Sequence, residues 1–190
     1  MLHKASRIRG APVHAIDGEV GHVEEFYVDD GSWTIRYLWV YTVSWLAHRP
    51  VLIPSNAIEP EWSVAGLTAR LTKDQVRNSP EIESPLSLSG LDEAQLLSHY
   101  IGYHLQARDG GIGHVDDFLF DERWSVRYLV VDTSNFIGGK SVVISPATLH
   151  GIDRSNQKLQ VALTRDEVRH SPSFDSIDVA PGEDIRIWIM

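Results

Sequence analysis

The chain has 190 residues with 43% hydrophobic side chains, enough to fill a folded core, and it has no cysteine, which excludes disulfides and thiolate zinc sites. Both halves are acidic: residues 1–88 hold 8 Lys and Arg against 11 Asp and Glu, a net charge of −3, and residues 89–190 hold 9 against 15, a net charge of −6. This charge disfavours nucleic acid and anionic membranes as partners, and neither an apolar run of roughly 20 residues nor a signal-peptide core is present, so we expect a cytoplasmic protein with a protein partner and no integral membrane segment.

An internal repeat organises the chain. With an offset of 92, residues 10–29 match residues 102–121 at nine of twenty positions, where composition alone gives about one or two. "LTKDQVRNSP" (71–80) likewise meets "LTRDEVRHSP" (163–172) at seven of ten positions. The chain therefore contains two copies of one structural unit, with a one-residue length difference in the turn before "WTIRYLWV" and "WSVRYLVV".

Within each copy the local signals are mainly those of β-strands. "DG" at 17–18 and "DGG" at 109–111 supply glycines for a hairpin turn, and a strand follows from Val20 or Ile112. The strands "WTIRYLWV" and "WSVRYLVV" carry apolar residues on both faces, which predicts cover on both sides. We expect further strands at 50–54, 66–72, 141–145 and 158–164.

Helices are predicted to be few and short. Thr72 with Gln75 and Thr164 with Glu167 have the spacing of a capping box, and Pro80 and Pro172 end the helical turns that follow. Between the copies, "PEIESPLSLSG" has the composition of a linker. A possible capping box at Ser89 and Asp92 then predicts a short helix over "LDEAQLLSHYIG", which packs on its neighbour or binds a partner.

The order and spacing of "DGxxGHVxxFxxD", "RYLxV", an apolar "VxI" strand and "LTxDxVRxSP" resemble the PRC-barrel family, twice over nearly the whole chain. That family includes the cytoplasmic domain of the photosynthetic reaction centre H subunit and the C-terminal barrel of a ribosome maturation factor. The resemblance implies an all-β fold of two small barrels in tandem, related by an approximate two-fold pseudosymmetry and acting through protein contacts. The expected domains are residues 1–83, a linker with a short helix at 84–97, and residues 98–190 with a C-terminal extension.

The repeated histidine and acids raise the question of chemistry. On a regular strand His22 shares a face with Glu24, as His114 does with Asp116, so each copy offers two ligands for a metal or a group that responds to protons. A complete metal site usually needs three or four ligands, so we expect these side chains to form a solvated or hydrogen-bonded rim and the protein to need no cofactor.

Signatures of catalysis are missing from the sequence. It has no G-x-S-x-G, H-E-x-x-H, Walker or dinucleotide-binding motif, and the three glycines at 109–113 open a strand, so no catalytic residue is assigned.

Aromatic residues are the better functional lead, since they are favoured as interface anchors. For the surface between the barrels or toward a partner we select Tyr37, Trp39, Trp45, Tyr128 and Val130. Trp62 and the terminal "IRIWIM" add further apolar groups, and that tail could add a strand within the chain or across a homodimer. The leading hypothesis is a non-enzymatic adaptor or scaffold, ahead of a sensor of a small ligand, protons or a metal, and of an unrecognised hydrolase.

Overall fold

The structure, a computed structural model, describes residues 1–59, 66–79, 94–135 and 139–179. Trp62, the Ser89 and Asp92 pair and the terminal "IRIWIM" lie outside the described residues. The chain forms two compact units. The first-repeat unit contains Ser6–Ser98 together with Glu122–Ser125, and the second-repeat unit contains Met1–Ala5, His99–Asp121 and residues 126–179.

The first-repeat unit is built on one sheet. Its strands are β2 (Pro12–Ala15), β3 (Gly18–Asp29), β4 (Thr34–Thr42), β5 (Pro50–Pro54), β6 (Leu67–Thr68) and β7 (Ala94–Leu96). The strand order is β5-β4-β3-β2-β6, with β7 paired to β3, and every pairing is antiparallel except that of β2 with β6. Its short helices include η1 (Ser44–Leu46), η2 (Ser55–Ala57) and α2 (Lys73–Arg77).

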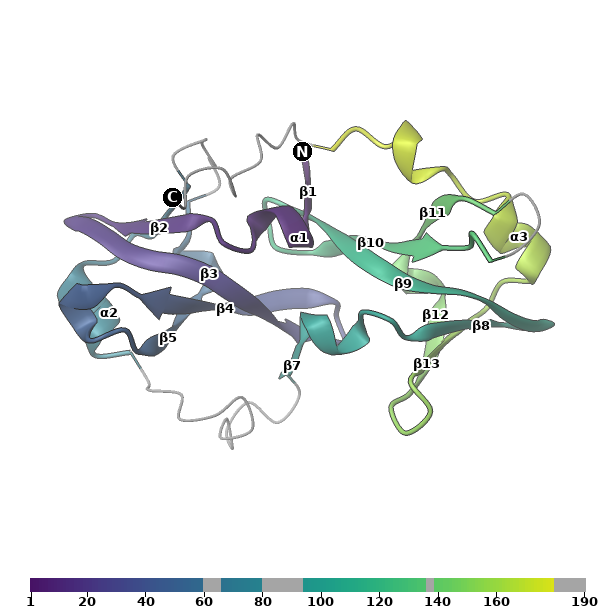
Figure 1. Ribbon diagram of the computed structural model, residues 1–190, viewed down its shortest axis with the longest axis horizontal. Coiled ribbons are helices and arrows are strands. Elements are labelled where there is room, and N and C mark those ends of the chain that lie inside the picture. Colours follow the sequence, from purple (N-terminus) through teal and green to yellow (C-terminus); the bar gives the residue numbers. More distant parts are fainter. Residues whose placement is uncertain (60–65, 80–93, 136–138, 180–190) are drawn as a thin grey trace. The chain divides into compact units, whose positions relative to one another are not determined.

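The second-repeat unit repeats this plan with one more strand. Its strands are β1 (Leu2–Lys4), β8 (His104–Ala107), β9 (Gly110–Asp121), β10 (Val126–Asp132), β11 (Ser141–Ile144), β12 (Leu149–Asp153) and β13 (Lys158–Val161). Their order is β11-β10-β9-β8-β13-β12, with β1 paired to β9 (Figure 1). The helices are η4 (Pro146–Thr148), α3 (Arg165–Arg169) and η5 (Phe174–Ser176), while α1 (Ala5–Ile8) follows β1 and η3 (Leu97–Tyr100) follows β7.

The prediction of a mostly β protein with little helix is confirmed by these two sheets. Within the residues described, neither sheet closes on itself, since the hydrogen-bonded path ends at β5 and β6 in one unit and at β11 and β12 in the other. The parallel pairings β2–β6 and β8–β13 bring the last main strand of each repeat beside its first. Strand composition predicts the strands themselves but carries no signal for this long-range pairing.

The two repeats exchange their leading strands. β1 pairs with β9 through Leu2↔Asp121 and Lys4↔Leu119, while β7 pairs with β3 through Ala94↔Asp29 and Leu96↔Tyr27. The offset of 92 relates β1 to β7, so the same position of each repeat serves the sheet of the other. This corrects the predicted helix, of which residues 94–96 form a strand and 97–100 a 3-10 helix, because the ladder on β3 and the burial of Leu96 outweigh a helical apolar pattern.

A bulge at the same place in both long strands decides which residues face outward. The register shifts between Val23 and Glu25 on β3, and between Val115 and Asp117 opposite β10. Phe26 and Phe118 enter the inner core with 0% exposure, and Glu25 and Asp117 are buried on the outer face. One extra residue in a strand moves every later side chain to the opposite face of the sheet. Without the bulge, these acids would therefore not lie on the outer face.

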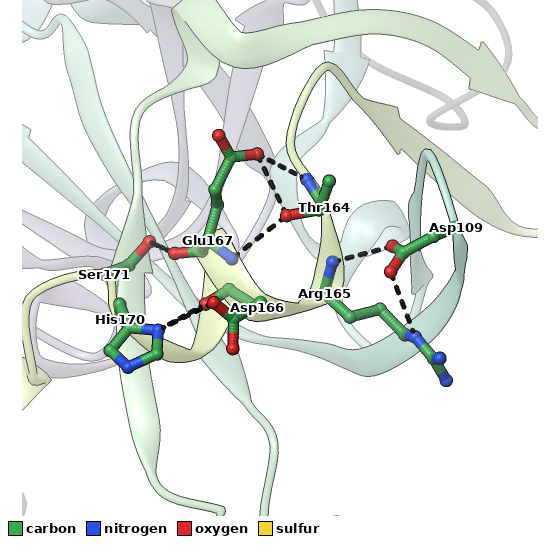
Figure 2. Close-up of polar contacts among 7 residues, drawn as sticks. All are labelled: Asp109, Thr164, Arg165, Asp166, Glu167, His170 and Ser171. Carbon is green, nitrogen blue, oxygen red and sulfur yellow. Dashed lines mark hydrogen bonds and ion pairs between the residues drawn. The ribbon is translucent and has the colours of Figure 1, made fainter.

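The closing helices are held by local hydrogen bonds that the sequence predicts. Figure 2 shows the capping box of α3: the Glu167 amide donates to Thr164 Oγ1 at 3.2 Å, and Glu167 Oε2 accepts from the Thr164 amide at 2.7 Å. In the β8–β9 turn, Asp109 Oδ1 accepts from the Arg165 amide at 2.7 Å (Figure 2). The first repeat has the same arrangement, with a capping box at Thr72 and Gln75. The predicted capping boxes at Thr72 and Thr164 are therefore confirmed.

Candidate functional site

An aromatic and aliphatic cluster covers the outer face of β3, β4, β5 and β7 in the first-repeat unit. Tyr27, Leu52 and Leu96 are buried in it, and Tyr37 and Trp39 pack against them while staying partly exposed. The ladders set this arrangement, since Tyr27 lies opposite both Tyr37 on β4 and Leu96 on β7, and Trp39 lies opposite Leu52 on β5. Directly opposed residues share a face of the sheet. We call these five residues the aromatic face.

Two polar atoms of the aromatic face have no hydrogen-bond partner. Tyr27 Oη and Trp39 Nε1 are buried and unpaired, and their rings lie 6.5 Å apart between centroids. Burial raises the pKa of Tyr27, and the nearby Glu25 carboxylate raises it further, so the phenol keeps its proton at neutral pH. Both atoms can therefore donate a hydrogen bond, and leaving a buried donor unpaired costs about 1–3 kcal/mol.

An ion pair between a buried carboxylate and a partly exposed arginine stands beside the aromatic face. Arg9 Nη2 lies 2.8 and 2.9 Å from the two oxygens of Glu25, and Glu25 Oε1 also accepts a hydrogen bond from the Phe26 amide at 2.8 Å. Glu25 has only 7% of its surface exposed. Its negative charge is thus satisfied within the unit, and the pair fixes the bulge that directs Tyr27 outward.

The equivalent face of the second-repeat unit is covered by the chain itself. There Leu119, Val130 and Val143 are buried, and the residues packed against them are Leu2, Tyr128, Phe174, Ile177 and Val179. Lys4 Nζ lies 3.5 Å from Asp117 Oδ2 and 5.2 Å from the centre of the Phe174 ring. Residues 82–87, which align with the covering segment 174–179, lie outside the described residues. The two repeats thus have equivalent outer faces that are formed by different residues.

The structure divides the five sequence-selected interface residues into three places. Tyr37 and Trp39 lie together on the aromatic face, and Tyr128 and Val130 lie on the covered face of the second-repeat unit. Trp45 is elsewhere: its Nε1 donates to the Val20 carbonyl at 2.9 Å, and Lys73 of α2 lies 5.2 Å from its ring centre. Trp45 therefore secures η1 and α2.

Sequence reasoning missed Tyr27, Leu52 and Leu96. The bulge after Val23 hides the alternation that would have placed Tyr27 beside Tyr37. Leu96 reaches the aromatic face through β7, a strand that the sequence did not predict. An aromatic residue two positions after the buried acid of "VEEFY" was the available signal.

The two histidine and acid segments behave differently. His22 Nε2 lies 2.9 Å from Glu24 Oε1, as the sequence pattern suggests. His114 Nε2 instead lies 3.9 Å from Asp132 Oδ2 on the neighbouring strand β10, although Asp116 occupies the same bulge position in β9 as Glu24 does in β3. Across the described parts of the chain, no group of three or more His, Cys, Asp or Glu side chains is arranged to hold a metal ion.

Comparison with known proteins adds no family to this description: no family model matches the chain, and no curated protein matches it. Of the helices in the described ranges, none has the length and apolar character needed to cross a membrane.

Proposed function

We propose that this protein is a non-enzymatic adaptor that binds a protein partner through the aromatic face of its first-repeat unit. In this proposal each repeat is a PRC-type barrel, and the two barrels are related by an approximate two-fold pseudosymmetry. The observation that carries the proposal is the pair of buried, unpaired donors, Tyr27 Oη and Trp39 Nε1, within a cluster whose Tyr37 and Trp39 remain partly exposed.

The chemistry of the aromatic face describes its partner. Tyr and Trp are the residue types that most often anchor interfaces, because they combine a large apolar surface with one polar atom. Two donors in an apolar setting suit a partner that presents an apolar side chain together with acceptor oxygens, such as backbone carbonyls. The formal net charge of −9 favours a partner surface that is neutral or basic.

The repeat supplies a matched test of this proposal. Tyr37 and Tyr128 occupy the same place in "RYL" of each repeat, one on the aromatic face and one on the covered face. We expect the tagged full-length protein to capture a partner from its own cells, Tyr37→Ala to lose at least about tenfold of that binding, and Tyr128→Ala to retain it. Binding of the captured protein is then measured with purified components.

A conservative variant separates recognition from folding. Trp39→Phe keeps an aromatic ring and removes the unpaired N–H, so the free protein should be as stable as the wild type or slightly more stable. If a partner accepts that hydrogen bond, the same variant weakens binding. Equal loss of binding in Tyr37→Ala and Tyr128→Ala, or full binding in both, would refute the assignment of the aromatic face.

A further inference from the structure

A hollow of about 360 Å³ lies on the sheet of the second-repeat unit. The side chains of His104, Gln106, His114, Asn135 and Lys158 contribute to its wall, and the remainder is formed mainly by the β8–β9 hairpin. All five side chains can donate hydrogen bonds, and lysine has no acceptor at all. This excess of donors distinguishes the hollow from the aromatic face.

The polar wall arises from one cross-strand row. Asp153, Lys158, His104, His114 and Asp132 lie in register on β12, β13, β8, β9 and β10 in that order. Opposed residues share a face of a sheet, so the row brings together side chains more than fifty positions apart in the sequence. The hollow is lined by the three middle residues, and the two acids stand at the ends of the row.

The acids at the ends of the row are engaged by their own loops. Asp132 Oδ1 accepts a hydrogen bond from the Ser134 amide at 2.7 Å, and this bond holds its pKa below the usual range. Asp153 accepts hydrogen bonds from the side chain and amide of Asn156, at 2.8 and 3.0 Å, which also lower its pKa. Both carboxylates therefore stay ionised at neutral pH.

We propose that this hollow binds a small oxyanion, a phosphate or carboxylate group, through Lys158, His104 and His114, with Gln106 and Asn135 as further donors. Lys158 supplies the positive charge of this site, and the two imidazoles and two amides add N–H donors beside it.

The equivalent row of the first repeat lacks most of these donors. The residues aligned with Lys158, His104 and His114 are Gly66, Pro12 and His22, so two of the three donors are absent. His22 there contacts Glu24 at 2.9 Å, and its ring lies 5.8 Å from that of Tyr41. The duplicated histidine alone does not define the hollow, which depends on Lys158 and His104.

The test uses the full-length protein and sulfate, which does not titrate between pH 5.5 and 8.0. Binding is followed by the histidine and backbone resonances in NMR spectra, at an ionic strength kept constant with sodium chloride. We expect saturable shifts at residues 104–114 and 158. Parallel titrations with inorganic phosphate and malonate identify the preferred group, and saturable binding of either supports the site.

Three variants decide between this site and its alternatives. Lys158→Gln should weaken binding at least about fivefold and His104→Gln should also weaken it, while His22→Gln serves as the matched control and leaves binding unchanged. Circular dichroism confirms that each variant is folded. Shifts that chloride reproduces, or binding unaffected by Lys158→Gln, would overturn the proposal. Stoichiometric zinc binding lost in His104→Gln would replace the oxyanion with a metal.

Discussion

At the scale of single residues, the buried acid of each long strand determines the outer face. Glu25 is 7% exposed and Asp117 is 3% exposed, and each is met by a cation, Arg9 at 2.8 Å or Lys4 at 3.5 Å. A buried carboxylate that loses its partner keeps the full cost of desolvation, whereas a solvated one is screened by water. The contribution of such an ion pair to stability therefore depends more on the burial of the carboxylate than on the presence of the pair.

This contrast gives a stability prediction. Arg9→Met leaves Glu25 buried and unpaired, so the free energy of unfolding should fall by about 3 kcal/mol. Arg36→Met removes an exposed pair, in which Arg36 Nη2 lies 2.9 Å from Asp29 Oδ2 with 53% of the arginine side chain accessible, and should cost less than about 1 kcal/mol. Urea denaturation of both variants measures the difference. Equal losses would show that burial of Glu25 has no energetic role.

At the scale of elements, the two capping boxes differ in one titratable group. Glu167 caps α3, and the backbone hydrogen bond from Thr164 is the main cause that lowers its pKa, as the bond from the Arg165 amide does for Asp109. The corresponding residue of α2 is Gln75, which carries no charge. A carboxyl whose folded pKa is lowered stabilises the fold above its unfolded value and loses that contribution as the pH falls through the folded value.

Acid should therefore loosen α3 before α2. Between pH 6 and pH 3 we expect amide exchange to accelerate more at residues 164–169 than at residues 72–77, as measured by hydrogen exchange corrected for intrinsic rates. Glu167→Gln gives α3 the cap that α2 has, and it should reduce that difference. A difference that stays unchanged in Glu167→Gln would assign the effect to Asp109 or to another acid.

The same elements show how far the sequence determines the fold. Both capping boxes were predicted because their partners lie three residues apart, and β5 was predicted to the residue as an apolar run between turn signals. β7 was not predicted, because three residues of ordinary composition become a strand only through pairing with Tyr27, Val28 and Asp29. No local feature of the sequence indicates the pairing of β7 with β3.

The candidate sites likewise contain residues that the sequence predicts and residues that it does not. Tyr37 and Trp39 were selected from the sequence as interface residues, and they lie together on the aromatic face because positions i and i+2 of a strand share a face. Trp45, six positions beyond Trp39, was selected with them but lies past the end of β4, where η1 turns it toward α2. Lys158 was predicted only as the first residue of a strand and not as a site residue, because only the parallel pairing of β13 with β8 places it beside His104.

At the scale of the whole molecule, the exchange of β1 and β7 makes neither repeat complete by itself. The first four residues contribute Leu2 to the covered face and Lys4 to the buried Asp117, while their own repeat receives Leu96 from the segment before β8. Exchange of an identical element between protomers is a low-cost route to a dimer. Here both copies are in one chain, so the exchange needs no second molecule.

Removal of residues 1–4 should therefore destabilise the second repeat, which is distant in the sequence, and leave the stability of the first repeat, which is near, unchanged. A chain that begins with Met before Ala5 loses the ladder from Leu2 to Asp121, the bridge from Leu2 to Val179 and the cation at Asp117. We expect amide protection to fall at residues 119–121 while residues 27–29 keep theirs, in native-state hydrogen exchange followed by NMR. Leu96→Ala is the reciprocal variant, with an expected cost of about 2 kcal/mol located at Tyr27 and Trp39. If the truncated chain instead lost protection first in β3, the exchange of strands would not describe the protein in solution. The loss of amide protection would then fall in the repeat that is near residues 1–4 in the sequence.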